Sequence, residues 1–170
     1  MQNAPPVFTV GHSTRSIDEF TRLLGLGEVT LVVDVRTVPR SRRNPQFNED
    51  ILPRELGPHG IAYTRIAGLG GLRSRSRELP EDVNGFWKNQ SFHNYADYAL
   101  TKEFRSALES LLELSSQNRC AIMCAEAVWW RCHRRIIADY LIARGREVCH
   151  LMGEHRIEPA SLTEGARIVD

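Results

Sequence analysis

The sequence lacks the segments that carry a protein into or across a membrane. No run approaches the ~20 consecutive apolar residues that a membrane-spanning helix needs. The first residues, Met1 to Pro6, have neither the basic start nor the apolar stretch of a signal peptide. We therefore expect a cytoplasmic protein with no membrane partner.

The sequence also lacks the composition of disordered, fibrous or disulfide-rich proteins. It has 8 prolines and 12 glycines in 170 residues, and 42% of it is hydrophobic, which is typical of a globular domain. We expect one domain over 1–170, with loose termini at 1–6 and 159–170. Four cysteines occur, and because most lie in or beside strand-like segments, we expect free thiols.

Lysine is nearly absent, with two lysines against twenty arginines. The net charge of +1 excludes the strong overall field of a non-specific nucleic-acid binder. The arginines are unevenly placed, because nine of them lie between Arg36 and Arg77, where only three acidic residues occur. Nucleic acid is therefore one candidate partner. A GC-rich genome would also produce a bias toward arginine, so composition does not decide whether the protein binds nucleic acid.

Apolar stretches of strand length alternate with segments of helical period, which is the pattern of βαβ units. The expected strands are Val7 to Val10, Thr30 to Val35, Ile61 to Tyr63, Cys120 to Cys124 and Val148 to Met152. The sequence thus predicts an α/β fold of three layers, in which a mostly parallel sheet of about five strands is flanked by helices.

Helix boundaries are marked by capping residues. Ser16 and Glu19 have the spacing of a capping box, and Thr101 is the expected N-cap of a helix that runs to about Ser116. A short helix is expected near 48–56, and another after Arg131. The segment 68–94 has no lasting periodicity and is predicted to be a long loop of the kind that binds ligands.

Polar and reactive side chains follow four of the predicted strands. In open parallel sheets, ligands bind outside the carboxyl ends of the strands, where the connecting loops converge. The residues at those ends are, in chain order, His12 and Ser13, Asp34 and Arg36, Arg65, and Cys124 and Glu126. We expect them to form one basic pocket that contains a thiol.

The segment from Cys124 to Arg134 holds the candidate nucleophiles. Cys132 is expected at a helix start beside several basic residues, and positive charge there favours thiolate over thiol, so its pKa should fall. Cys124 ends a strand, and the sequence does not decide whether it faces the pocket or the core. Both thiols also fit an alternative reading as small packing residues.

Two other cysteine chemistries stay open. Cys124, Cys132 and His133, with Glu126 or His12, are suitable ligands for zinc or iron, although their spacing matches no common zinc finger. The two cysteines are not a CxxC redox pair, but a loop would still be able to bring their sulfurs together. The tyrosine-phosphatase pattern fails, because the sixth residue after Cys124 is Trp130 and not arginine.

Three further motifs have a functional and a structural interpretation. Asp34 and Arg36 are either an acid–base carboxylate and an anion clamp or a mutual ion pair. The segment Gly68 to Leu72 is glycine-rich, but it lacks the order of a phosphate-binding loop. Loop aromatics, including Phe92 and Trp129, would either stack on a nucleobase or cover the core.

Taken together, these motifs resemble a bacterial and archaeal family known as domain of unknown function 488, over nearly all of the chain. The matching pieces are Gly11-His12-Ser13, Asp34-Val35-Arg36 with Pro39 and Ser41, Phe47, Tyr63, Leu69-Gly70-Gly71, Tyr95, Cys124-Ala125-Glu126 and Cys132-His133-Arg134. The resemblance implies a compact α/β domain and a shared polar site built from these pieces, and it implies no particular reaction.

The leading hypothesis is an enzyme, a thiol-dependent transferase or hydrolase, that acts on a small anionic ligand bearing a phosphate or a nucleotide. The candidate catalytic residues are Cys124, Cys132, Glu126, Asp34 and His12. The candidate ligand-binding residues are Ser13, Arg36, Ser41, Gly70, Gly71, Tyr95, His133 and Arg134. The alternatives are a nucleic-acid or nucleotide binding module without catalysis, and a zinc- or iron-dependent enzyme. The sequence does not identify a cofactor or an oligomeric state.

Overall fold

A computed structural model of the chain describes residues 4–153 and 155–169. Six strands form one sheet in the order β3-β2-β4-β1-β5-β6. Their bounds are β1 Val7–Gly11, β2 Leu31–Asp34, β3 Ala62–Arg65, β4 Cys120–Cys124, β5 Val148–Gly153 and β6 Arg156–Pro159. The pairings among β1 to β5 are parallel, and β6 pairs with β5 in the antiparallel sense. The predicted α/β fold with a mostly parallel sheet is confirmed, with one strand more than expected.

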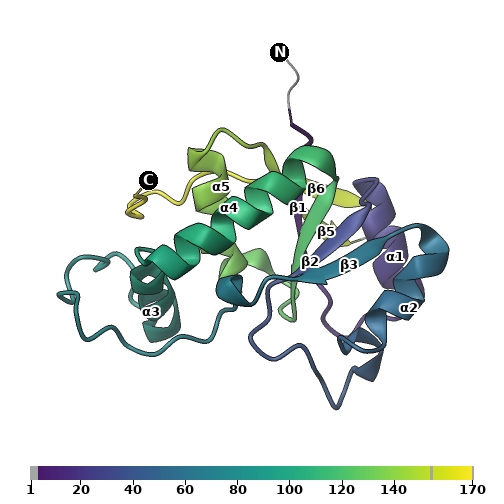
Figure 1. Cartoon of the computed structure of the whole chain (residues 1–170), viewed down its shortest axis with the longest axis horizontal. Helices are drawn as coiled ribbons and strands as arrows, with labels where there is room; N and C mark the ends of the chain where they lie inside the picture. The colour runs from purple at the N-terminus through teal and green to yellow at the C-terminus, as the bar shows by residue number, and fades with distance from the viewer. Residues whose placement is uncertain (1–3, 154, 170) are drawn as a thin grey trace.

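Helices cover both faces of the sheet (Figure 1). The α-helices are α1 Ile17–Leu26, α2 Leu52–Leu56, α3 Gln90–Tyr98, α4 Lys102–Gln117 and α5 Arg134–Ala143. Side chains of α1 and α2 pack in one core cluster with Val32 of β2, and those of α3, α4 and α5 pack in a second cluster with Leu31 and Val33. Successive side chains of a strand point to opposite faces, so the continuous apolar run of β2 supplies both cores and confirms three layers.

Local capping signals are confirmed. The Ser16 side chain accepts a hydrogen bond from Glu19 N while the Glu19 carboxylate accepts one from Ser16 N, which is the predicted capping box of α1. The Thr101 side chain accepts from Phe104 N at 3.2 Å and begins α4 as expected. These contacts involve residues close in sequence, so the sequence was sufficient to identify them.

The prediction that the segment 68–94 is entirely loop is wrong at the end of the segment. Helix α3 begins within it at Gln90, and the Asn89 side chain caps it by accepting from the backbone N–H groups of Ser91 and Phe92. The helix buries Tyr95 and Ala96 against the α4 side of the sheet. It has little more than two turns, so its apolar positions do not repeat often enough to establish a period.

Two residues near the end of the chain form hydrogen bonds with the sheet and with α5. Strand β6 extends the sheet, and Ala160 N then donates to Val148 O at 2.8 Å. Thr163 N donates to the buried Asp139 carboxylate of α5 at 2.8 Å. Ala160 and Thr163 thus contact the body of the domain, and 1–3 and 170, which were also predicted to be loose, lie outside the described residues.

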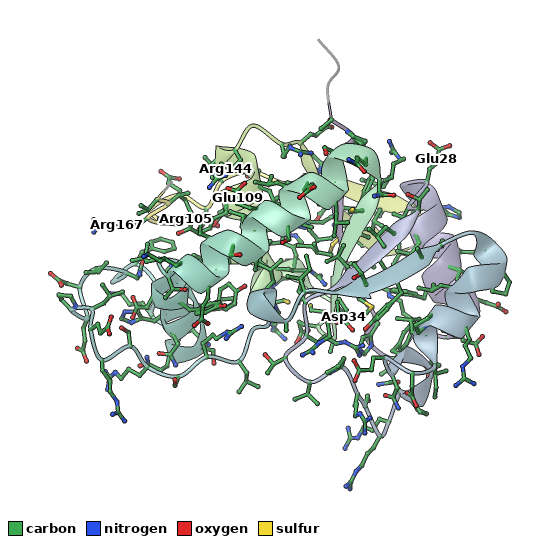
Figure 2. All side chains as sticks on the ribbon, viewed as in Figure 1. Glu28, Asp34, Arg105, Glu109, Arg144 and Arg167 are labelled. Atoms are coloured by element: carbon green, nitrogen blue, oxygen red, sulfur yellow. The ribbon has the colours of Figure 1, made fainter. Side chains whose placement is uncertain are left out.

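Ion pairs occur both on the surface and in the interior. Arg144, the residue after α5, donates to Glu109 of α4 at 2.6 Å, and both side chains are partly exposed (Figure 2). Exposed pairs of this kind contribute at most ~1 kcal/mol. Asp34, labelled in the same view, is wholly buried, and its pairing is described below. None of the described helices is long and apolar enough to cross a bilayer.

Candidate functional site

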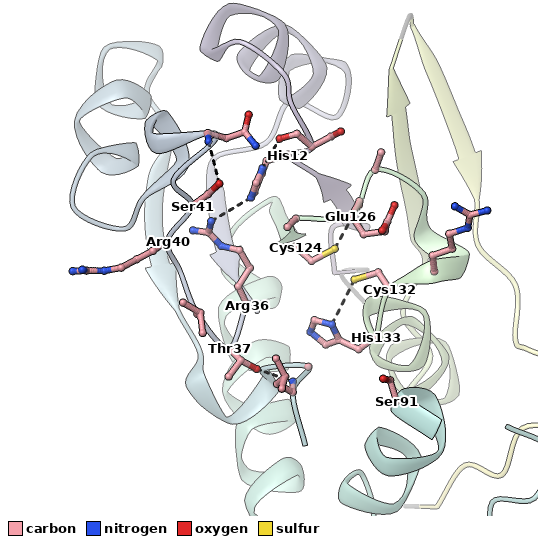
Figure 3. Close-up of a pocket in the computed structure, with 18 of the residues that line it drawn as sticks. His12, Arg36, Thr37, Arg40, Ser41, Ser91, Cys124, Glu126, Cys132 and His133 are labelled. Carbon is pink, nitrogen blue, oxygen red and sulfur yellow. Dashed lines mark hydrogen bonds between the residues drawn. The ribbon is translucent and has the colours of Figure 1, made fainter. Parts of the chain in front are cut away.

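A cavity of about 790 Å³ lies at the carboxyl ends of β1, β2 and β4 (Figure 3). Three segments that are far apart in the sequence line it: 12–14 after β1, 36–44 after β2, and 124–133 after β4. The predicted proximity of these segments is thus confirmed. The predicted site residues that line the cavity are His12, Ser13, Arg36, Ser41, Gly71, Cys124, Glu126, Cys132 and His133.

Cys124, the last residue of β4, presents its sulfur to the cavity. The residue is only 3% exposed, and Nη1 of Arg134 donates to its Sγ at 3.2 Å. Burial opposes ionisation, but a hydrogen bond from the Cys132 thiol and the charge of Arg134 outweigh it and lower the Cys124 pKa to about 7. Cys124 is therefore a more acidic thiol than an ordinary cysteine.

Cys132 behaves in the opposite way, so the prediction of a lowered pKa for this thiol is wrong. Helix α5 begins two residues later, at Arg134. Cys132 is 5% exposed, and burial together with the neighbouring Cys124 sulfur raises its pKa well above the ordinary value. Two adjacent sulfurs do not both ionise readily, and the one in contact with the Arg134 guanidinium carries the charge.

The Arg134 guanidinium donates a hydrogen bond to the Cys124 sulfur but does not line the cavity. The residue is 0% exposed, and its guanidinium donates to Glu126 O at 3.0 Å and to Ala127 O at 3.1 Å. Its expected role as a ligand-binding residue does not fit this burial. The same contacts hold the loop after β4 over β1, where Gly11 has no side chain to obstruct it. A Cβ at Gly11 would lie 1.8 Å from Glu126 O.

His133 is held as a neutral imidazole. Its Nε2 donates to Val35 O at 2.7 Å, because a carbonyl oxygen only accepts, and this leaves Nδ1 unprotonated at 3.5 Å from Cys132 Sγ. Burial lowers the His133 pKa to about 4. The free lone pair of Nδ1 is therefore a proton acceptor beside the Cys132 thiol.

Gly71 packs directly against this imidazole, and its replacement by alanine tests the contact. A Cβ at Gly71 would lie 2.4 Å from His133 Nδ1, so Gly71→Ala is expected to displace the ring from Val35 O and to destabilise the fold by about 1–3 kcal/mol. Urea denaturation measures the change. Gly25→Ala is the matched control, because nothing lies within 4 Å of its Cβ position in α1. Equal effects of the two substitutions would contradict the contact.

Asp34 and Arg36 form a mutual ion pair, one of the two arrangements predicted. Asp34 Oδ2 lies 2.7 Å from Arg36 Nη2, and Oδ1 accepts from Arg36 Nε at 2.9 Å and from Arg36 N at 3.1 Å. The Tyr63 hydroxyl also donates a hydrogen bond to Asp34 Oδ2, at 2.5 Å. Asp34 is 0% exposed and does not line the cavity, so its expected acid–base role does not fit. The carboxylate positions Arg36 instead.

His12 joins this network at the cavity wall. Its Nδ1 donates to Ser13 O at 2.8 Å, and its Nε2 lies 3.3 Å from Arg36 Nη1, which donates to it. The ring stacks on Phe47 at 4.4 Å, and burial lowers its pKa to about 4. His12 is thus a neutral acceptor for Arg36 at neutral pH. Ser13 has φ 47°, which is unusual for a residue with a side chain.

The rim of the cavity is basic. Arg40, Arg43 and Arg131 are exposed and line it, together with the exposed Glu126. Among the described residues none of these three arginines has a carboxylate partner. Arg40 and Arg43 belong to the arginine-rich stretch seen in the sequence, but no sequence signal placed Arg131 on the rim.

Several other lining residues were missed by sequence reasoning. They are Thr14, Thr37, Val38, Asn44, Leu72, Asn89, Ser91 and Ala127. Most belong to loops, and Asn89 and Ser91 lie at the start of the unpredicted helix α3. Their place depends on long-range packing, for which the chain has no local pattern. Of the loop aromatics that were candidates for base stacking, Phe92 lines the cavity, while Trp129 stacks on His150 at 4.6 Å.

Three predicted site residues are placed elsewhere. Tyr95 is fully buried, and its hydroxyl donates to Leu69 O at 2.8 Å. Gly70 packs against Thr37, where a Cβ would lie 2.9 Å from Oγ1. Arg65 donates to Thr37 O at 2.7 Å. All three shape the wall behind the cavity, so the glycine pair serves close packing and does not form a phosphate cradle.

The predicted alternative of a metal site lacks its geometry. No three His, Cys, Asp or Glu side chains come together to hold a metal ion in the parts of the chain at 4–153 and 155–169.

Comparison with known proteins gives one match. A family model described as "Domain of unknown function DUF488" matches residues 16–141. The match is shorter than the nearly complete resemblance expected from the motifs, because Gly11, His12 and Ser13 precede it. No curated protein and no solved structure shows significant similarity to the chain.

Proposed function

The chain belongs to the family described as domain of unknown function DUF488, whose model covers most of it, and from that premise and the site geometry we propose that it is an enzyme that uses Cys124 as a nucleophile. The proposed substrate is a small anionic compound bearing a phosphate or a nucleotide. The reaction class is transfer or hydrolysis through a covalent thiol intermediate.

One observation supports the nucleophile above all others. A buried guanidinium, that of Arg134, donates to the Cys124 sulfur at 3.2 Å, and this sulfur lines an open cavity. A thiol that merely fills the core does not need a charged partner, and burying an arginine without a compensating role is costly. The arrangement is of the kind that activates cysteines in enzymes.

The anionic substrate is inferred from the rim. Three exposed arginines, Arg40, Arg43 and Arg131, border the cavity, and within 4–153 and 155–169 none of them has a carboxylate partner. Guanidinium groups bind phosphate in a bidentate manner. Arg36 contributes less, because most of its donors bind Asp34 and Phe47 O. The volume of about 790 Å³ is within the ~300–1,000 Å³ of typical small-molecule sites.

The proposed reaction begins with the Cys124 thiolate. Its electron pair forms a bond to an electrophilic carbon or phosphorus of the substrate, and the bond from that atom to the leaving group breaks. Glu126, the exposed carboxylate on the rim, is our candidate to exchange the proton with the leaving group or with an attacking water. His12 and Ser13 line the cavity beside this segment, since their backbone N–H groups donate to Cys124 O and Ala125 O, and they are our candidates to contact the substrate.

Selective alkylation tests the nucleophile. At neutral pH, iodoacetamide is expected to modify Cys124 roughly tenfold faster than Cys149, whose pKa is raised by burial and by Glu147, because the larger thiolate fraction outweighs the lower nucleophilicity of a more acidic thiol. Cys124→Ser should abolish the fast phase, and Cys149→Ser should leave it unchanged. Mass spectrometry of the modified peptides identifies the site. Equally slow thiols at 124 and 132 would refute the proposal.

A non-catalytic binding module is the competing function, because Arg42 is exposed beside Arg40 and Arg43 in the loop after β2. Binding of a single-stranded oligonucleotide that weakens steeply with salt, is lowered by Arg42→Ala, and occurs without any covalent adduct at Cys124 would favour it. Arg42 does not line the cavity, so a substrate confined to the cavity should be insensitive to that substitution.

A further inference from the structure

We propose that Cys124 and Cys132 form a reversible disulfide, in which Cys132 resolves a Cys124 thiol that has been oxidised by a hydroperoxide. The inference rests on the proposed function to the extent that both require Cys124 to be the reactive thiol. It adds a second activity to the same cavity, the two-electron reduction of a hydroperoxide.

The two sulfurs lie against the same residue. Arg134 donates from Nη1 to Cys124 Sγ at 3.2 Å and from its backbone N to Cys132 Sγ at 3.4 Å. Both cysteines line the cavity, and Figure 3 shows their sulfur atoms directed toward each other. They are eight positions apart in the chain, and the loop between them folds back to bring them together.

The other cysteines are excluded from this pairing by their positions. Cys120 begins β4, is wholly buried in the core and does not line the cavity. Cys149 lies in β5, where its sulfur is directed toward the Glu147 carboxylate. Cys132 is therefore the thiol positioned to react with an oxidised Cys124, before the sulfur is oxidised further.

The first step oxidises Cys124. The thiolate attacks the terminal oxygen of a hydroperoxide, a sulfur–oxygen bond forms and the oxygen–oxygen bond breaks. The products are a sulfenic acid on Cys124 and an alkoxide or hydroxide, which takes up a proton from solvent in the open cavity. The Arg134 guanidinium stabilises the thiolate before attack.

The second step forms the disulfide. The Cys132 sulfur displaces hydroxide from the Cys124 sulfenic acid, so a sulfur–sulfur bond forms and the sulfur–oxygen bond breaks. The unprotonated His133 Nδ1, 3.5 Å from Cys132 Sγ, accepts the thiol proton and returns it to the departing hydroxide as water. In sum, two thiols are oxidised and the hydroperoxide is reduced, and an external dithiol restores both thiols.

Mass spectrometry of the full-length protein tests the disulfide. After an equimolar dose of hydrogen peroxide, the wild-type protein should lose two hydrogens, and peptide mapping should join Cys124 to Cys132. Dithiothreitol should restore the original mass. Cys149→Ser is the matched control and should form the same disulfide.

Cys132→Ser is the decisive variant. It should accumulate a sulfenic acid at Cys124 that dimedone traps, whereas the wild type should give little adduct because Cys132 consumes the sulfenic acid. Equal dimedone labelling of the two proteins, or a disulfide that joins Cys124 to Cys149, would overturn the inference. Rapid alkylation of Cys124 in the reduced protein would then still support the proposed nucleophile, so the two failures are distinguishable.

Discussion

Asp34→Ala is expected to lower the free energy of unfolding by about 3–5 kcal/mol, because it leaves the Arg36 charge buried without its partner. The carboxylate is wholly buried and accepts bonds from Arg36 and Tyr63. Arg36 is itself only 6% exposed, so water does not replace the lost oxygens. Urea denaturation measures the loss, provided that the m-value, the slope of the unfolding free energy against urea concentration, is the same in both proteins.

Tyr63→Phe is the control for this substitution. It removes one donor to Asp34 and keeps the ion pair and the ring, so a loss of about 1 kcal/mol is expected. The two variants separate the cost of an unpaired buried charge from the cost of one hydrogen bond. A loss for Asp34→Ala no larger than that for Tyr63→Phe would show that Arg36 finds another partner or reaches solvent.

Arg134→Met is expected to raise the Cys124 pKa from about 7 toward or above the ordinary thiol value near 9. The sign follows from the physical causes: burial disfavours the thiolate, and the substitution removes a positive charge and a hydrogen bond that favour it. In the wild type the thiolate is lost as the pH falls through about 7. In the variant it should be lost about 2 pH units higher, which is a ~100-fold smaller thiolate fraction below pH 7.

The measurement is the pH dependence of Cys124 alkylation, or of the ultraviolet absorbance of the thiolate. Arg131→Met is the matched control, because Arg131 is an exposed arginine on the rim of the same cavity. In this variant the pH midpoint of the Cys124 titration should move little. Arg134→Lys keeps a charge near the sulfur and should give an intermediate midpoint if Arg134→Met folds poorly. An unchanged midpoint in both Arg134 variants would show that the guanidinium does not activate the thiol.

The sequence was sufficient for features that depend on near neighbours. The continuous apolar run of β2, the capping box of α1 and the N-cap of α4 were all predicted, because each is determined by residues within one strand or one turn. The convergence of His12, Arg36 and Cys124 was also predicted, since it follows from the rule that loops meet at the carboxyl ends of parallel strands.

Features that depend on distant contacts were not predicted. The sequence placed Cys132 near a helix start, but its burial and its contact with the Cys124 sulfur reverse the expected direction of its pKa. Tyr95 and Gly70 were expected to bind the ligand, yet both pack behind the cavity. Strand β6 was missed because its exposed, mixed residues have no clear alternation.

The empty space at Gly11 limits which residues can replace this glycine. The loop that carries the Glu126 carbonyl crosses β1 through a gap that even a single methyl group would close. The guanidinium of Arg134 occupies the same gap, 2.8 Å from where that methyl would lie. Folding and thiol activation therefore share one steric requirement, and alanine, usually the mildest replacement for glycine, would impair both at once.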